Sequence, residues 1–192
     1  MGETDNRPTE NRYTIVSSDC HAGANMATYE MYLERRWKDE FAEWRGSYNN
    51  PFRDLQDDGR SRNWDDQRRI GDLNSDGVVA EIVFPNTVPP FFPTGALITY
   101  PPTQRAEYER RLAGTRAHNR WLLDWCAPYS DRRCGLPQIF LNDLDDTISD
   151  LEWIADNGFR SFLLPAVPPD QGIPGLWDPI YERLWSVVRD LD

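Results

Sequence analysis

Two residues of the sequence have side chains and a spacing that could bind a metal ion. Asp19 and His21 lie two positions apart, after the β-branched segment 13–18, which predicts a buried strand. Residues i and i+2 of an extended chain point the same way, so a carboxylate oxygen and an imidazole nitrogen can converge on one divalent ion. Zinc, manganese and iron all accept such mixed ligands. Aspartate at a strand end is also common as a turn or cap residue, and the spacing alone leaves both interpretations open.

Short apolar segments alternate with helix-forming segments along the chain. The apolar pattern predicts strands at residues 13–18, 78–84, 134–141 and 159–164. Helices are predicted over 103–125 and 145–157, and two more are predicted to begin after Asp65 and after Asp178. A further helix is predicted from the spacing of Leu33, Trp37, Phe41 and Trp44, which would share one apolar helical face. This alternation predicts an α/β fold of parallel strands joined by right-handed βαβ units.

The carboxyl ends of parallel strands are where such folds place their chemistry. Asp19 and His21 follow the first predicted strand, and Asn86 follows the second. The proline-rich loop after Asn86 also carries Phe91 and Phe92. These three residues are candidates to wall a substrate pocket, and a stiff loop that packs on its own fold is an equal alternative. The arginines between 105 and 120 alternate with acids, which predicts a solvated helix face.

Several segments together resemble one family. Residues 15–23 (IVSSDCHAG) resemble the first strand of the amidohydrolase-related proteins, within the metal-dependent TIM-barrel hydrolases; this group includes decarboxylases similar to aminocarboxymuconate-semialdehyde and γ-resorcylate decarboxylases. Residues 64–85, 119–122, 158–165 and 177–185 resemble later elements of the same family in the same order. The resemblance implies that residues 13–192 are the first four strands of a (β/α)8 barrel, which ends before a fifth strand.

The resemblance also implies a function for the first strand. Family members use His-x-His or acid-x-His as two metal ligands there, and Asp19 and His21 match the two positions. Their remaining ligands follow the fifth, sixth and eighth strands, so no catalytic residue is assigned within this chain. His118 lies inside a predicted helix and is expected to be a surface or packing residue. Cys20 lies between the two ligands with no second histidine to activate it, which argues against a nucleophile.

The composition and net charge of the chain disfavour some classes of binding partner. The net charge of -11 disfavours nucleic acids and anionic membranes, and no apolar run is long enough to span a bilayer. The first twelve residues are polar and lack a signal-peptide core, so we interpret them as a disordered leader and the protein as cytoplasmic. The three cysteines suggest neither a disulfide framework nor a zinc knuckle.

Two hypotheses follow. In the first, the chain belongs to a metal-dependent hydrolase or non-oxidative decarboxylase that acts on a small carbonyl or carboxylate substrate. Its divalent ion is expected to be zinc, with manganese or iron as alternatives. The missing half is supplied by another copy, by a complementing chain or by a longer native protein. In the second, it is a catalytically inactive fragment that acts as a binding or assembly module, since a half-barrel leaves open strand edges. A doubly wound nucleotide-binding fold ranks third, because no GxGxxG or P-loop motif follows a strand.

Overall fold

The structure, a computed structural model, describes residues 13–48, 61–86, 89–93, 100–166 and 172–191. The predicted leader, residues 1–12, lies outside these ranges. The elements in chain order are β1 Ile15–Ala22, η1 Met26–Tyr32, η2 Arg35–Trp37, α1 Lys38–Ser47, α2 Asp66–Ser75, β2 Val78–Pro85, α3 Arg105–Cys126, η4 Ala127–Tyr129, β3 Arg133–Gly135, α4 Leu144–Asp156, η5 Pro179–Tyr181 and α5 Glu182–Asp190.

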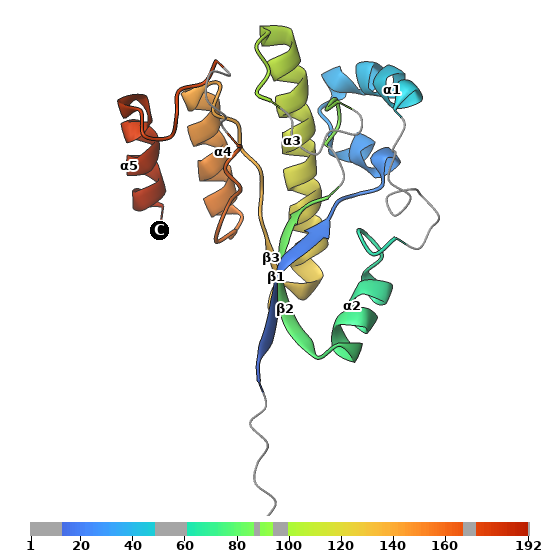
Figure 1. The fold of residues 1–192 in the computed structure, drawn as a ribbon. Coiled ribbons are helices and arrows are strands. Elements are labelled where there is room, and N and C mark those ends of the chain that lie inside the picture. The colour runs from blue at the N-terminus through green and yellow to red at the C-terminus, as the bar shows by residue number, and fades with distance from the viewer. Residues whose placement is uncertain (1–12, 49–60, 87–88, 94–99, 167–171, 192) are drawn as a thin grey trace, which may run out of the picture.

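The described part of the chain forms a parallel sheet in the order β1-β2-β3. Figure 1 shows α3 running along the sheet, with α1 and α2 on one side and α4 and α5 on the other. This confirms the predicted α/β class with parallel strands. No helix among the described residues is both long and apolar enough to cross a membrane.

Local side-chain chemistry sets the helix ends. The side chain of Asp65 accepts a hydrogen bond from the backbone of Arg68 and so caps α2, while Asp143 and Asp178 cap α4 and η5 in the same way. Gly77 ends the α2 turn with a positive φ of 71°, a backbone conformation that glycine adopts without a steric penalty. The helix starts predicted after Asp65 and Asp178 are confirmed.

The third and fourth strands differ from the prediction. β3 ends at Gly135, and the segment 159–164 contributes only an isolated bridge between Leu163 and Gln138. Pro137 interrupts the third segment, and proline has no backbone N–H to give to a ladder. Its carbonyl still accepts a bond of 2.7 Å from the Leu163 backbone, so the two segments remain parallel neighbours with little regular pairing.

The predicted helical face in residues 33–44 is also only partly correct. Leu33 has an extended backbone between two 3-10 turns, and α1 begins at Lys38. Leu33 and Phe41 are nevertheless buried in one core, with Trp37 and Trp44 packed against it. The sequence pattern therefore reports which side chains are buried, although the backbone achieves that burial without a continuous helix.

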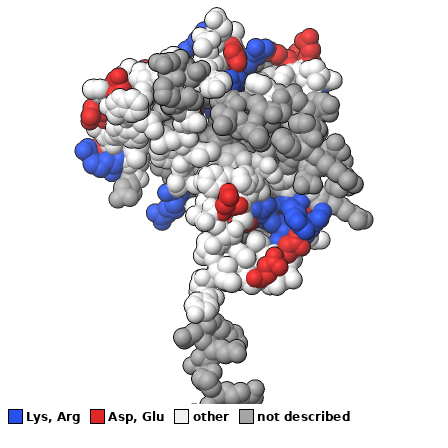
Figure 2. Space-filling model, in the orientation of Figure 1, with Lys and Arg blue, Asp and Glu red and all other residues white. Residues whose placement is uncertain are grey.

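Two principal apolar cores hold the elements together. The first packs β1, β2 and α1 against α3, around Phe41, Val83, Trp121 and Leu122. The second packs the segment after β3 against α4 and α5, around Leu141, Ile154 and Leu184. On the face shown in Figure 2, acidic and basic side chains are interspersed, with no large patch of one sign.

Candidate metal site

Asp19 and His21 lie near the carboxyl end of β1, which pairs with β2. Their neighbours Cys20 and Ala22 belong to or pack against the first core, so the alternation of a strand places Asp19 and His21 on the opposite, open face. The Asp19 side chain is 84% exposed and that of His21 47%. Asp19 lies within a bulge between Ser17 and Cys20, where three steps along β1 match two steps along β2, and His21 follows that bulge.

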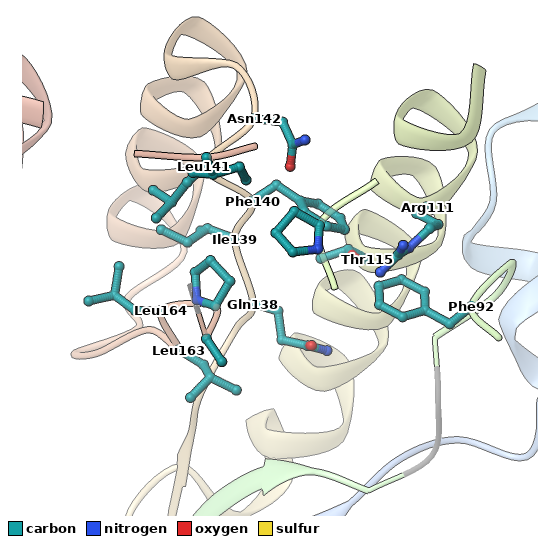
Figure 3. A pocket seen from close by; sticks show the side chains of 14 residues that line it. Phe92, Arg111, Thr115, Gln138, Ile139, Phe140, Leu141, Asn142, Leu163 and Leu164 are labelled. Atoms are coloured by element: carbon teal, nitrogen blue, oxygen red, sulfur yellow. The ribbon is translucent and has the colours of Figure 1, made fainter. Parts of the chain in front are cut away.

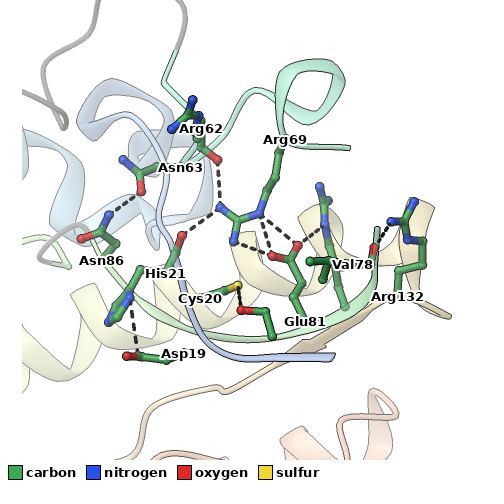
Figure 4. A network of polar contacts seen from close by, with 12 residues as sticks. Asp19, Cys20, His21, Arg62, Asn63, Arg69, Val78, Glu81, Asn86 and Arg132 are labelled. Carbon is green, nitrogen blue, oxygen red and sulfur yellow. Dashed lines mark hydrogen bonds and ion pairs between the residues drawn. The ribbon is translucent and has the colours of Figure 1, made fainter. Parts of the chain in front are cut away.

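The two side chains point toward one another (Figure 4), with His21 Nδ1 3.9 Å from Asp19 Oδ1. Metal–ligand bonds of about 2.0–2.2 Å at a tetrahedral angle place two donors ~3.4 Å apart, so Asp19 and His21 could share a divalent ion once their donor atoms approach by ~0.5 Å. Among the described residues, no group of three or more His, Cys, Asp or Glu side chains could hold a metal. Within the described residues, Asp19 and His21 are therefore two candidate metal ligands without a third.

A buried ion pair behind the strand fixes the backbone of His21. Arg69 Nη1 donates to the His21 carbonyl at 2.9 Å, and the same guanidinium makes a bidentate contact with Glu81 through Nε at 3.0 Å and Nη2 at 2.7 Å. Arg133 approaches Glu81 from the other side at 3.5 Å. Figure 4 shows Arg69 lying between the end of β1 and Glu81 of β2. The carboxylate thus orients the arginine that holds the strand end.

Sequence reasoning missed this network, although one signal was present. Glu81 interrupts the apolar segment VVAEIVF of β2, and its side chain is fully buried. An ionised carboxylate in an apolar strand needs a cationic partner. Glu81 could therefore have indicated a buried arginine or lysine partner, but only the tertiary structure identifies Arg69 and Arg133.

Cys20 has no feature of a nucleophile. Its thiol faces the core and donates to Ser17 Oγ at 3.0 Å. Burial is the main cause that raises the pKa of Cys20 above its ordinary value, which keeps the thiol protonated at neutral pH. A protonated thiol is a weak nucleophile, in agreement with the sequence-based expectation.

His118 is a packing residue rather than a third ligand. It is fully buried in α3, and Nδ1 shares a hydrogen bond of 2.8 Å with the Tyr29 hydroxyl. Burial lowers the pKa of His118 to about 3, so the imidazole is neutral under ordinary conditions. Of the two expected alternatives, a surface or a packing residue, the structure shows the packing residue.

The three candidate substrate residues lie in different surroundings. Asn86 stays next to the end of β1: its backbone N–H donates to the Ala22 carbonyl at 2.9 Å, and its side chain bonds to Asn63. Phe91 packs in the first core, whereas Phe92 lines a cavity beside α3. A substrate contact by any of the three remains a prediction.

The predicted solvated arginine face of α3 is wrong for Arg111 and only partly correct for Arg116 and Arg120, which are partly buried. Arg105 is largely exposed, as expected. Arg111, however, is only 3% exposed, and its guanidinium lies over the Phe92 ring at 4.4 Å. The ring comes from a loop distant along the chain, so the helix sequence alone could not indicate this burial.

Known structures share this fold. A 2,6-dihydroxybenzoate decarboxylase from Rhizobium is 18% identical with a TM-score of 0.58, over 94% of this chain and 48% of its own. A 5-carboxyvanillate decarboxylase from Novosphingobium aromaticivorans, solved with manganese and 4-hydroxy-3-methoxy-5-nitrobenzoic acid, is 19% identical with a TM-score of 0.58, over 95% and 49%. An amidohydrolase from Mycobacterium avium subsp. paratuberculosis is 13% identical with a TM-score of 0.63, over 93% and 56%.

The chain therefore spans about half the length of these solved structures. It matches the N-terminal half of TIM-barrel amidohydrolases, as the sequence predicted. No match was found among curated proteins. The sequence model described as amidohydrolase matches residues 21–190, starting at His21. Because that match covers most of the sequence, the chain belongs to the amidohydrolase family.

Proposed function

We propose that the chain provides the first-strand metal ligands of a metal-dependent hydrolase or non-oxidative decarboxylase that acts on a small carbonyl or carboxylate compound. The observation that carries the proposal is the pair Asp19 and His21, which converge on the open face of β1 with 3.9 Å between their donor atoms. Decarboxylases of small aromatic acids share the fold, two of them solved with manganese, which supports this reaction class.

Asp19 and His21 would hold a divalent ion, with a carboxylate to offset its charge and a neutral imidazole nitrogen as the second donor. When bound, such an ion polarises a carbonyl or carboxylate oxygen, or lowers the pKa of a water molecule. Zinc is the ion first expected from the sequence, and the manganese in related structures makes Mn²⁺ the better probe. Further ligands would come from outside the described residues.

The remaining residues would position the pair and the substrate. Arg69 holds the His21 carbonyl and so limits movement of the strand end. Asn86, bonded to the neighbouring Ala22 carbonyl, would present its side-chain amide beside the pair. Phe92, and Phe91 if the loop rearranges, would supply apolar contact to the substrate.

Metal content tests this proposal. We expect the protein dialysed against Mn²⁺ to retain metal, and Asp19→Ala and His21→Ala each to lose most of it, because one remaining donor binds weakly. Asp131→Ala, an exposed aspartate in another loop, is the matched control and keeps the metal content of the parent. Equal metal content in all four proteins would contradict the assignment and favour the alternative of a binding or assembly module.

A further inference from the structure

A cavity of about 200 Å³ lies beside the N-terminal half of α3. Its walls come from α3, from the segment 138–142 after β3, from Phe92 and from residues 163–166 (Figure 3). Asp19, His21 and Asn86 are not among its described lining residues. The cavity is smaller than the ~300–1,000 Å³ typical of sites for drug-sized ligands, so its occupant must be small.

Three hydrogen-bond donors in this wall are unsatisfied. Arg111 Nε, Thr115 Oγ1 and Gln138 Nε2 are buried and have no hydrogen-bond partner within the described part of the chain. Arg111 is 3% exposed and Thr115 only 1%. Unsatisfied buried polar atoms are rare, because each costs about 1–3 kcal/mol. Three of them around one cavity indicate a missing acceptor.

Thr115 is unusual in its own helix context. A helical threonine normally bonds back to the carbonyl one turn earlier, as Thr147 does with the Asp143 carbonyl at 2.7 Å. Thr147 Oγ1 also contacts the Phe140 carbonyl. Thr115 makes neither kind of contact among the described residues, although it lines the cavity. Its hydroxyl therefore lacks a hydrogen-bond partner in the wall of this cavity.

Arg111 is held in place without using its inner edge. Nη1 donates to Glu107 at 3.2 Å at the rim, and the guanidinium lies over Phe92 at 4.4 Å and Phe140 at 5.7 Å. These contacts orient the guanidinium and account for its burial, but they leave Nε unsatisfied. A fixed guanidinium edge is the group that best matches a carboxylate.

The rest of the wall selects for charge and shape. No described lining residue is acidic, and Arg111 is the one charged side chain among them. Leu163 and Leu164 contribute apolar side chains to the wall, and Phe140 adds an aromatic ring beside Arg111. Figure 3 shows Arg111, Thr115 and Gln138 around the space that these apolar residues close. The cavity therefore combines the guanidinium of Arg111, which can bind an anion, with apolar side chains.

We propose that this cavity binds a small monocarboxylate with an apolar body, whose carboxylate accepts hydrogen bonds from Arg111 Nε, Thr115 Oγ1 and the Gln138 amide. Its apolar body contacts Leu163, Leu164 and Phe140. Inorganic phosphate would satisfy the donors but leave the apolar wall unused. The site shares Phe92 with the proposed substrate loop and otherwise stands apart from the metal pair, so it needs no bound ion.

Titration calorimetry with benzoate in the presence of EDTA tests the site. We expect one saturable site per chain, with benzyl alcohol and inorganic phosphate each binding much more weakly. Arg111→Met and Thr115→Val each remove a donor to a charged acceptor, so the affinity for benzoate should fall by about tenfold or more. The adjacent Arg110→Met alters an exposed pair with Glu40 and should leave the affinity unchanged.

Thr115→Val also separates a binding role from a structural one. Valine has the same shape and removes a buried hydroxyl without a partner, so the variant should fold at least as stably as the parent while it loses benzoate affinity. Absence of saturable benzoate binding, unchanged affinity in Thr115→Val and Arg111→Met, or equally tight binding of benzyl alcohol or phosphate would each overturn the proposal. Asp19→Ala and His21→Ala should keep the benzoate affinity of the parent, so the test of this cavity can succeed or fail independently of the test of the metal pair.

Discussion

Replacing Glu81 with glutamine tests whether a buried ion pair supports the end of β1. The side chain of Glu81 is fully buried and that of Arg69 is 9% exposed. The carboxylate accepts bonds of 3.0, 3.0 and 2.7 Å from Arg69, while Arg133 lies 3.5 Å away. Glutamine keeps the shape and one acceptor oxygen, but its NH2 group then faces guanidinium groups that can only donate.

The expected loss is large. Removing one partner of a buried ion pair costs about 3–5 kcal/mol, because the remaining charge is left uncompensated. Arg69 loses its carboxylate partner here, whereas Arg133 keeps an ion pair with Asp66 at 2.7 Å, so the estimate applies to one uncompensated guanidinium. A typical domain has a free energy of unfolding of about 5–15 kcal/mol. The substitution should therefore remove a substantial fraction of the stability of the fold.

Urea unfolding followed by tryptophan fluorescence measures the change. We expect the midpoint for Glu81→Gln to drop sharply, with little change in the slope. Glu40→Gln is the matched control: it alters a half-exposed pair with Arg110, which should contribute about 0.2–1 kcal/mol. If the two variants unfolded at similar urea concentrations, the supporting role of Glu81 would be refuted.

Further predictions concern packing and pH. A Cβ on Gly114 would overlap the Pro90 carbonyl oxygen, whereas nothing lies within 4 Å of a Cβ on Gly71. In thermal melts, Gly114→Ala should therefore lower the free energy of unfolding by about 1–3 kcal/mol, and Gly71→Ala should raise it by up to ~1 kcal/mol. Equal effects of the two substitutions would contradict the close approach of Gly114 to Pro90. Burial lowers the pKa of His118 to about 3, so the unfolded chain alone takes up this proton below pH ~6.5. The His118 contribution to stability is complete above that pH and is lost by about 1.4 kcal/mol per unit as the pH falls toward 3; urea titrations between pH 5 and 7 should show a shallower dependence in His118→Gln, and an identical dependence would contradict the assigned burial.

The features that the sequence predicted correctly depend on local interactions. Asp65, Asp143 and Asp178 cap their helices through backbone N–H groups two or three residues further along, so the signal lies within a few residues. The pairing of Asp19 with His21 on one face is equally local, because it follows from strand alternation. Residues in such short-range relationships can be identified without the fold.

The features that it missed depend on distant partners. Arg111 is buried because Phe92 and Phe140 approach it from other segments, and helix periodicity carries no trace of either ring. Pro137 is the exception, because it is a local signal: it shortens the third strand although the residues around it are apolar. The pairing of Glu81 with Arg69 could not be predicted, because the sequence contains many arginines and only the fold brings this one next to Glu81.

The central claim is that Asp19 and His21 bind one divalent ion together, and the chain has just two histidines with which to test it. Substoichiometric Mn²⁺ should broaden the imidazole NMR signals of His21 much more strongly than those of buried His118, because paramagnetic broadening falls steeply with distance from the ion. The selective broadening should disappear in Asp19→Asn, since the ion then loses its carboxylate. Broadening that affects both histidines equally, or that persists unchanged in Asp19→Asn, would contradict the shared site.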